Sequence, residues 1–129
     1  DTPASKKFAA SFKKRWGADR VVADPQESAY NMVYLWKQAV EDAGTFDDNA
    51  VREALVGQTF DAPQGPVEVM PNHHLSQTVR IGEINAEGGF TILEETGVVL
   101  PQAWNQKHPS SKGFACDWTD PSKGEKYKL

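Results

Sequence analysis

The spacing of apolar residues changes near Gly57, and this change limits the folds open to the chain. Before Gly57, apolar residues return every three or four positions, which is typical of helices that bury one side. After Gly57 they alternate with polar residues, which is typical of half-buried strands. We therefore predict an α/β chain with helices in its first half and a β-hairpin followed by an extended tail in its second half.

The first and third predicted helices have clear boundary signals. Thr2 before Pro3 is typical of an N-cap followed by proline in the first turn, and Gly17 is typical of a helix end. A shorter helix is expected to begin at Asp47 or the next residue and to end at Gly57.

The second helix has the strongest start signal. We expect Asp24 as the N-cap, Pro25 at the first helical position and Glu27 as the capping glutamate, with Gly44 at the end. Residues 21–23 form a short apolar run that predicts a strand leading into this helix. The apolar side predicted for the helix consists of Ala29, Met32, Val33, Trp36, Ala39, Val40 and Ala43.

The second half has the patterns of a half-buried strand and a β-hairpin. Proline and glycine in residues 62–65 predict a turn, and Val67 and Val69 alternate with a glutamate as in a half-buried strand. Residues 78–94 read as a β-hairpin with a glycine-containing loop. Regular patterns stop from residue 97, and the aromatic residues of this tail are expected to anchor on another surface: Trp104, Phe114, Trp118 and Tyr127.

Charge and hydropathy exclude two classes of partner. The net charge of −4 and the isoelectric point near 5.3 argue against nucleic acid, because phosphate binding needs a basic face. No apolar run approaches the roughly 20 residues that span a bilayer, so we expect no membrane insertion.

The sequence also lacks the usual signatures of catalysis. Its residues of metal-ligand type do not have the spacing of a zinc site, and no phosphate-binding loop or nucleophile motif is present. We therefore predict no enzyme activity, no metal site and no cofactor. Trp16 and Trp36 lie on predicted apolar helix sides, where core packing is the first explanation. The four residues of metal-ligand type are His73, His74, His108 and Cys116.

Cys116 is the single cysteine of the chain, and two interpretations stay open. It is either a free buried thiol or one half of a disulfide whose partner lies outside this chain. If the partner is absent, the thiol is expected to react with labelling reagents, because its neighbours indicate a partly exposed loop.

Several segments resemble one protein family. They run in the same order as in the last third of type I periplasmic solute-binding proteins, and the resemblance is specific to the urea and short-chain amide branch of the Leu/Ile/Val-binding superfamily. It covers nearly all 129 residues. The residues that carry it are 1–5, Asp24-Pro25-Gln26-Glu27-Ser28-Ala29-Tyr30-Asn31-Met32-Val33, Phe60-Asp61-Ala62-Pro63-Gln64-Gly65-Pro66-Val67, Asn72-His73-His74, Ile81-Gly82-Glu83-Ile84, Pro101-Gln102-Ala103-Trp104 and Cys116-Asp117-Trp118.

This resemblance implies a two-lobed periplasmic receptor that closes on urea or a short amide and presents it to an ABC permease. Residues 1–58 would belong to the first lobe, 59–96 would hold the crossover and strands of the second lobe, and 97–129 would form the tail. The chain would then be a fragment that does not bind solute alone. Because its apolar faces would lack their partners, we expect it to self-associate.

Two other functions stay open from the sequence. One is an amide-sensing regulator of the same fold, and the other is an independent protein-interaction module.

The solute-contacting residues are predicted from the junction at which residues 21–23 lead into the second helix. Ligands of open α/β folds lie beyond the carboxyl ends of strands, where a helix start offers free N–H groups. We therefore predict that Glu27, Ser28 and Tyr30 line the interlobe cleft. The alternative is that Glu27 only caps the helix and that Tyr30 only packs.

Overall fold

The computed structural model describes residues 2–102, and it confirms the predicted helices in the first half and the β-hairpin in the second. The four strands lie in the sheet in chain order, and each pairs antiparallel with the next. The elements are α1 (Pro3–Trp16), α2 (Asp24–Ala43), α3 (Asp48–Leu55), β1 (Thr59–Ala62), β2 (Gly65–Val69), β3 (Leu75–Ile84) and β4 (Phe90–Val99).

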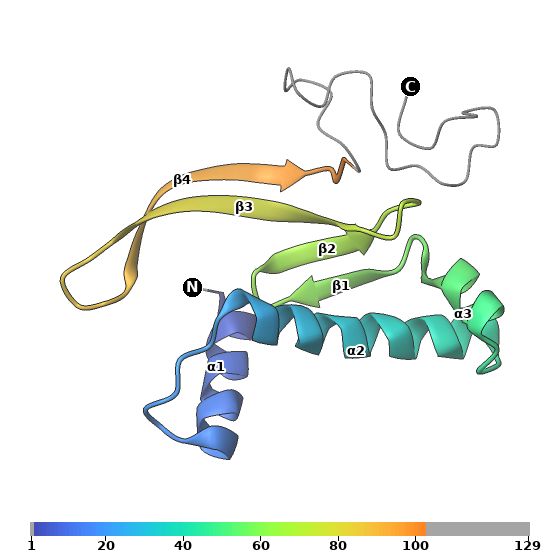
Figure 1. The fold of residues 1–129 in the computed structure, drawn as a ribbon, viewed down its shortest axis with the longest axis horizontal. Coiled ribbons are helices and arrows are strands. Elements are labelled where there is room, and N and C mark those ends of the chain that lie inside the picture. The colour runs from blue at the N-terminus through green and yellow to red at the C-terminus, as the bar shows by residue number, and fades with distance from the viewer. Residues whose placement is uncertain (1, 103–129) are drawn as a thin grey trace, which may run out of the picture.

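The helices cover only one part of the sheet. Figure 1 shows α2 running along the β1–β2 hairpin, with α1 near the start of α2 and α3 near its end. The long β3–β4 hairpin extends past the helices, and every residue of β4 is exposed. The sheet therefore has a packed region at β1–β2 and an open region toward the loop of residues 85–89.

Side chains and glycines at the helix ends explain why the predicted boundaries are close to the observed ones. The Thr2 hydroxyl accepts a hydrogen bond from the Ser5 N–H at 3.0 Å, and Asp47 accepts from the Ala50 N–H at 3.0 Å. Gly44 has φ 63°, a left-handed conformation that glycine adopts without the strain a Cβ would introduce.

The start of α2 differs from the prediction by one residue. Ala23 is the N-cap, and Asp24 is the first helical residue. The Gln26 side chain accepts a hydrogen bond from the Ala23 N–H at 3.2 Å, whereas alanine has no side-chain acceptor to complete a capping box. Gln26 is the residue three positions after Ala23, so it supplies the cap that we expected of Glu27.

The strand predicted at residues 21–23 does not form. Ala23 has an extended backbone, but no strand of residues 2–102 pairs with this segment. Val21 is 81% exposed as a result. An extended apolar run becomes a strand only when a neighbour satisfies its backbone groups, and that neighbour is missing from this part of the chain.

The side of α2 that packs on the sheet is also not the predicted one. Asn31, Leu35 and Ala39 are buried, and of these only Ala39 belongs to the predicted apolar side. Helix α2 therefore presents its more polar side to the sheet and leaves most of its apolar side uncovered by the described residues. The exposed members include Met32 (52% exposed), Val33 (63%) and Trp36 (48%).

A small core joins α2 to the first two strands. Leu35 is fully buried and packs against Ala62, Val67 and Val69. The alternation predicted for β2 is confirmed, because Val67 and Val69 are buried while Glu68 between them is exposed.

The second hairpin is longer than predicted. It covers residues 75–99 instead of 78–94, so β4 continues past residue 97 to Val99. The pairing shifts register between Thr78 and Arg80, and again between Ile81 and Gly82. Trp16 is 61% exposed and Trp36 is 48% exposed, so the core packing expected of both does not occur within residues 2–102. The tail aromatics Trp104, Phe114, Trp118 and Tyr127 lie outside the described residues.

Candidate functional site

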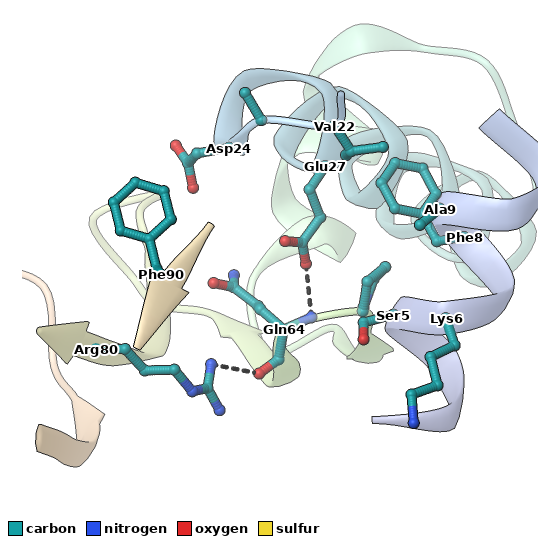
Figure 2. A pocket seen from close by; sticks show the side chains of 12 residues that line it. Ser5, Lys6, Phe8, Ala9, Val22, Asp24, Glu27, Gln64, Arg80 and Phe90 are labelled. Atoms are coloured by element: carbon teal, nitrogen blue, oxygen red, sulfur yellow. Dashed lines mark hydrogen bonds between the residues drawn. The ribbon is translucent and has the colours of Figure 1, made fainter. Parts of the chain in front are cut away.

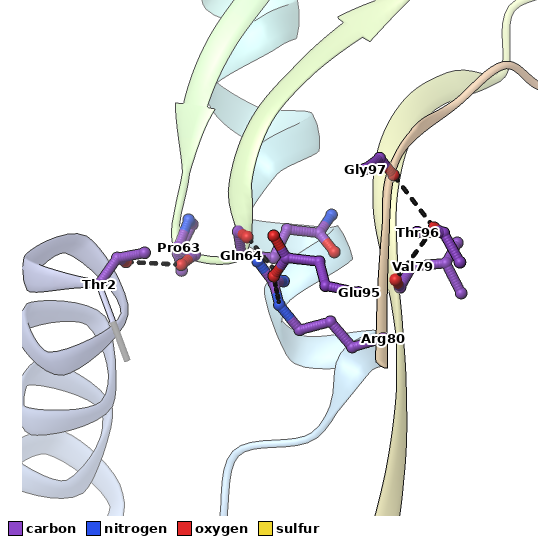
Figure 3. Close-up of polar contacts among 8 residues, drawn as sticks. All are labelled: Thr2, Pro63, Gln64, Val79, Arg80, Glu95, Thr96 and Gly97. Atoms are coloured by element: carbon purple, nitrogen blue, oxygen red, sulfur yellow. Dashed lines mark hydrogen bonds and ion pairs between the residues drawn. The ribbon is translucent and has the colours of Figure 1, made fainter. Parts of the chain in front are cut away.

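Side chains from three separate segments meet at the two-residue turn between β1 and β2. Thr2 Oγ1 donates a hydrogen bond to the Pro63 carbonyl at 2.9 Å. The Gln64 N–H donates to Glu27 Oε1 at 2.8 Å, and Arg80 Nη1 donates to the Gln64 carbonyl at 2.9 Å (Figures 2 and 3). Three consecutive polar groups of the turn backbone are thus bound by the N-cap of α1, the first turns of α2 and strand β3.

The Thr2 hydroxyl has two functions in this arrangement. Its oxygen accepts from the Ser5 N–H and so caps α1, while its proton is donated to the Pro63 carbonyl. A hydroxyl has one donor and two acceptor positions, so both bonds form at once.

Glu27 is a tertiary contact and not a helix cap. One oxygen of its carboxylate accepts from the Gln64 N–H, and the same oxygen accepts from Asn31 Nδ2 at 3.4 Å. Asn31 is 1% exposed, so its amide holds the carboxylate from the buried side of α2. A hydrogen bond from a backbone N–H to a carboxylate is stronger than a neutral one.

Arg80 binds two partners from β3. Its Nε forms an ion pair with Glu95 Oε2 on β4 at 2.7 Å, while Nη1 reaches the Gln64 carbonyl. Gln64 is further tied to β3 through its side chain, which donates to Gln77 Oε1 at 3.0 Å.

Glu27, Gln64 and Arg80 border a cleft of about 570 Å³. Figure 2 shows the Glu27 carboxylate and the Gln64 side chain projecting into it, with Phe90 and Arg80 on one side and α1 on the other. The cleft offers carboxylate acceptors, cationic groups, a hydroxyl and an amide, which suits a small polar solute. Its lining residues with polar side chains are Ser5, Lys6, Asp24, Glu27, Gln64 and Arg80.

Of the three predicted solute-contacting residues, only Glu27 lines this cleft. Ser28 is exposed and borders neither this cleft nor the second hollow described next. Tyr30 faces a second hollow of about 460 Å³, which Phe60 and Asp61 also line. The three residues therefore do not meet in one pocket of the described residues, and their contact with a solute stays a prediction.

Tyr30 is a member of an aromatic cluster. Its ring centroid lies 4.7 Å from that of Phe8, 4.8 Å from that of Tyr34 and 6.1 Å from that of Phe60. Interaction with the Tyr34 side chain, together with burial, raises the pKa of the Tyr30 hydroxyl above its ordinary value of 10.0. The packing role considered for Tyr30 is thus present in the structure.

The start of α2 offers fewer free N–H groups than expected. The Ala23 N–H is bound by the Gln26 side chain, the Gln26 N–H is bound by the Ala23 carbonyl at 3.1 Å, and Pro25 has no N–H. The polar groups that the cleft offers are therefore mainly side chains and not backbone N–H groups of the helix start.

Sequence reasoning missed Thr2, Gln64, Arg80 and Phe90 as members of this site. The turn around Gln64 was visible from its proline and glycine, but nothing in a local pattern indicated what would bind it. Arg80 alternates with apolar residues, so its position in a strand was predictable while its partner was not.

Metal and membrane signals are weak in this part of the chain. Within residues 2–102 no group of three His, Cys, Asp or Glu side chains is close enough to hold a metal ion. His73 and His74 are exposed in the turn after β2, while His108 and Cys116 lie outside the described residues. None of the three helices is both long enough and apolar enough to cross a membrane.

Comparison with known proteins identifies relatives for most of the chain. The family described as "Periplasmic binding protein domain" matches residues 1–110. Among curated proteins, the chain is 31% identical over 101 residues to a Geobacillus stearothermophilus protein named limonene hydroxylase, covering 78% of this chain and 19% of that protein. It is 28% identical over 86 residues to Leu/Ile/Val-binding protein homolog 6 of Brucella abortus (strain 2308), covering 65% of this chain and 22% of that protein.

A solved structure shares the fold. It is an ABC-transporter solute-binding protein of R. palustris in complex with benzoate, with a TM-score of 0.66 and 19% sequence identity. The match covers 80% of this chain and 29% of that one. The chain thus spans about a fifth of the length of the curated relatives and under a third of this structure.

Proposed function

The chain belongs to the periplasmic binding protein domain family, and from this membership we propose that it is part of a receptor that binds a small solute for ABC-type import. The observation that carries the proposal is the family match over residues 1–110, which includes every element of the fold. The hydroxylase name of the Geobacillus relative does not describe this chain on our proposal, because this chain covers 19% of that protein and itself matches the periplasmic binding protein domain family. On this proposal the protein is not an enzyme.

We further propose that the solute is urea or a short-chain amide. The Phe60–Val67 and Asn72–His74 segments support this choice through their resemblance to that branch. The cleft supports it through Asp24 and Glu27, whose carboxylates accept hydrogen bonds from the N–H groups of an amide.

One structural relative is in complex with benzoate, and the cleft suits benzoate less well than urea or an amide. A benzoate carboxylate would meet Asp24 and Glu27, and like charges in one site repel. Two cations line the cleft, Lys6 and Arg80. Arg80 already binds Glu95 and the Gln64 carbonyl, which leaves Lys6 as the lining cation to balance the two carboxylates and the benzoate.

The division into lobes follows from the same proposal. Residues 1–58 would lie in the first lobe, and 59–96 would provide the crossover and strands of the second. Because β4 continues to Val99, the proposed tail of 97–129 would leave the strand only after that residue. The full-length protein would work outside the cytoplasmic membrane, in the periplasm, and would dock on an ABC permease. Glu27 is then the solute contact best supported by geometry, and Ser28 and Tyr30 are candidates for surfaces that the rest of the protein completes.

The uncovered apolar surfaces support two further parts of the proposal. The outer side of α2 and both faces of β3–β4 carry large exposed apolar residues, more than an isolated soluble domain usually shows. In the full-length protein these surfaces would meet the remaining sheet and helices. In the chain alone they favour self-association, and the incomplete cleft leaves buried polar groups of a solute without partners, so the chain alone is expected not to bind.

Calorimetry on the full-length protein tests the function and the solute separately. We expect saturable binding of urea or acetamide, and no comparable binding of leucine or benzoate. Binding of leucine or benzoate alone would refute the solute class and leave the receptor function standing. If none of the four binds, the proposed solute class is refuted, and a wider set of small solutes that also showed no binding would refute the receptor function. The 129-residue chain serves as the control, and sub-millimolar binding by it would contradict the proposed incomplete cleft.

A further inference from the structure

The turn between β1 and β2 is bound more extensively than the hairpin itself requires. Strands β1 and β2 already close the turn through the pairing of Ala62 with Gly65. Even so, three backbone groups of the turn each form a hydrogen bond with a side chain from elsewhere in the fold: the Pro63 carbonyl, the Gln64 N–H and the Gln64 carbonyl. The additional bonds therefore act between elements and not within the hairpin.

These bonds connect the helical part to the long hairpin. Thr2 is the N-cap of α1 and Glu27 belongs to α2, whereas Arg80 belongs to β3. Thr2 reaches Pro63 (Figure 3), and Glu27 and Arg80 reach Gln64 (Figure 2). Among residues 2–102, the Thr2 bond is the one hydrogen bond recorded between α1 and the sheet or its turns. The Gln64 turn thus lies where the two parts are joined.

The charges at the turn strengthen the arrangement. A carboxylate binds the Gln64 N–H, and a guanidinium binds the Gln64 carbonyl. Each charge matches the partial charge of the backbone group it faces, and charge-assisted bonds of this kind are about twice as strong as neutral ones. Pro63 is buried, so its carbonyl would lose a needed partner if Thr2 withdrew.

We propose that Thr2, Glu27 and Arg80 form a turn lock around Pro63–Gln64 that fixes the helical part relative to the β3–β4 hairpin and thereby sets how readily the cleft closes on its solute. The inference rests on the proposed receptor function, because it concerns the closure of the same cleft. Thr2 and Arg80 act in it as positioning residues through the turn, and neither needs to touch the solute.

Thr2 allows the lock to be separated from helix capping. Thr2→Asp keeps an oxygen that caps α1 but has no proton for the Pro63 carbonyl, whereas Thr2→Ser keeps both functions. Arg80 has an equally close control: Arg80→Met removes both of its bonds, and Glu95→Gln removes only the charge of the ion-pair partner.

The readout is the distance between the two parts in the full-length protein. Lys14→Cys and Glu87→Cys place spin labels at two exposed positions, and the distance between these labels is measured. The Cys116→Ser background leaves no other cysteine of this chain to label. Pulsed electron paramagnetic resonance with and without urea or acetamide gives the distance distribution, and calorimetry gives the affinity.

We expect Thr2→Asp and Arg80→Met to broaden the distance distribution and to weaken solute binding about five-fold, the equivalent of one hydrogen bond. Thr2→Ser and Glu95→Gln should match the parent. An unchanged distribution in both test variants, even with a lower melting temperature, would overturn the lock, as would equal effects in the controls. If the parent binds neither urea nor acetamide, the proposed solute class fails, while the distance distributions without solute still test the lock.

Discussion

Replacing Leu35 and its neighbour Trp36 by alanine should have very different costs, because α2 turns an unexpected side to the sheet. Leu35 is fully buried among Ala62, Val67 and Val69, whereas Trp36 is 48% exposed. Removing a fully buried leucine side chain forfeits its transfer free energy and leaves a cavity, which together cost about 2–5 kcal/mol. For Leu35→Ala we take about 3 kcal/mol, which changes the unfolding equilibrium about 150-fold.

Trp36→Ala should cost the chain much less. The described contact of its ring is with Phe46, at a centroid distance of 6.2 Å, and such a pair is worth about 0.5–1.5 kcal/mol. In the full-length protein, where we propose that the remaining chain covers this side of α2, the same substitution should cost about 3–5 kcal/mol.

Denaturation in guanidinium chloride measures both effects, at protein concentrations low enough to keep the 129-residue chain monomeric. It also avoids urea, which is a proposed solute. With a slope of about 3 kcal/mol per molar, Leu35→Ala should lower the midpoint by about 1 M, and Trp36→Ala by about 0.3 M. If Trp36→Ala destabilises the 129-residue chain as much as Leu35→Ala does, the orientation of α2 is wrong. If Trp36→Ala is equally mild in the full-length protein, nothing covers the outer side of α2.

Three further predictions concern other parts of the chain. His73 has φ 60°, so His73→Gly should relieve left-handed strain and raise the unfolding free energy by about 1 kcal/mol, and a loss of stability would contradict this. The pKa of Tyr30 is raised in the folded state, so folding favours the protonated hydroxyl. This contribution to stability is fully present below pH 10 and is lost as pH rises through the folded-state pKa. Tyr30→Phe should therefore lose melting temperature less steeply above pH 10 than the parent, and equal slopes would refute the cause. Light scattering should find the 129-residue chain self-associated, and a clean monomer at high concentration would show that its apolar surfaces are covered within the chain.

The boundaries of the elements were largely predictable because their signals are local. Thr2, Gly44 and Asp47 act on backbone groups within four residues of themselves, so sequence alone indicates their effect. The one-residue error at the start of α2 also concerns a local capping signal. Gln26 and Glu27 are adjacent residues with equivalent capping ability, and sequence reasoning assigned the cap to the wrong one.

The orientation of α2 was not predictable, because it depends on what lies on each side of the helix. The apolar period correctly identified an amphipathic helix, but a period does not say which neighbour is present. In residues 2–102 the available neighbour is the β1–β2 hairpin, which packs on Leu35. The strand expected at residues 21–23 failed for a related reason, since a strand needs a pairing partner that this part of the chain does not supply.

The candidate site was predictable only at one residue. Glu27 was identified from a helix-start pattern, yet its hydrogen-bond partner is the Gln64 backbone, 37 positions away. No local pattern contains such a contact. The turn at Gln64 and the strand containing Arg80 could each be predicted, but their meeting depends on the three-dimensional arrangement.

The sequential order of the strands bears on how this part of the protein reaches its structure. Each strand pairs with its neighbour in the chain, across turns at residues 63–64, 70–74 and 85–89. Closing such short loops costs little chain entropy, and contacts between segments close in sequence are associated with fast folding. The three hairpin pairings can therefore form from local encounters, whereas the bonds from Thr2 and Glu27 to the turn must bridge 61 and 37 positions. On kinetic grounds the sheet should form first, and the helices should dock afterwards on a turn that already exists.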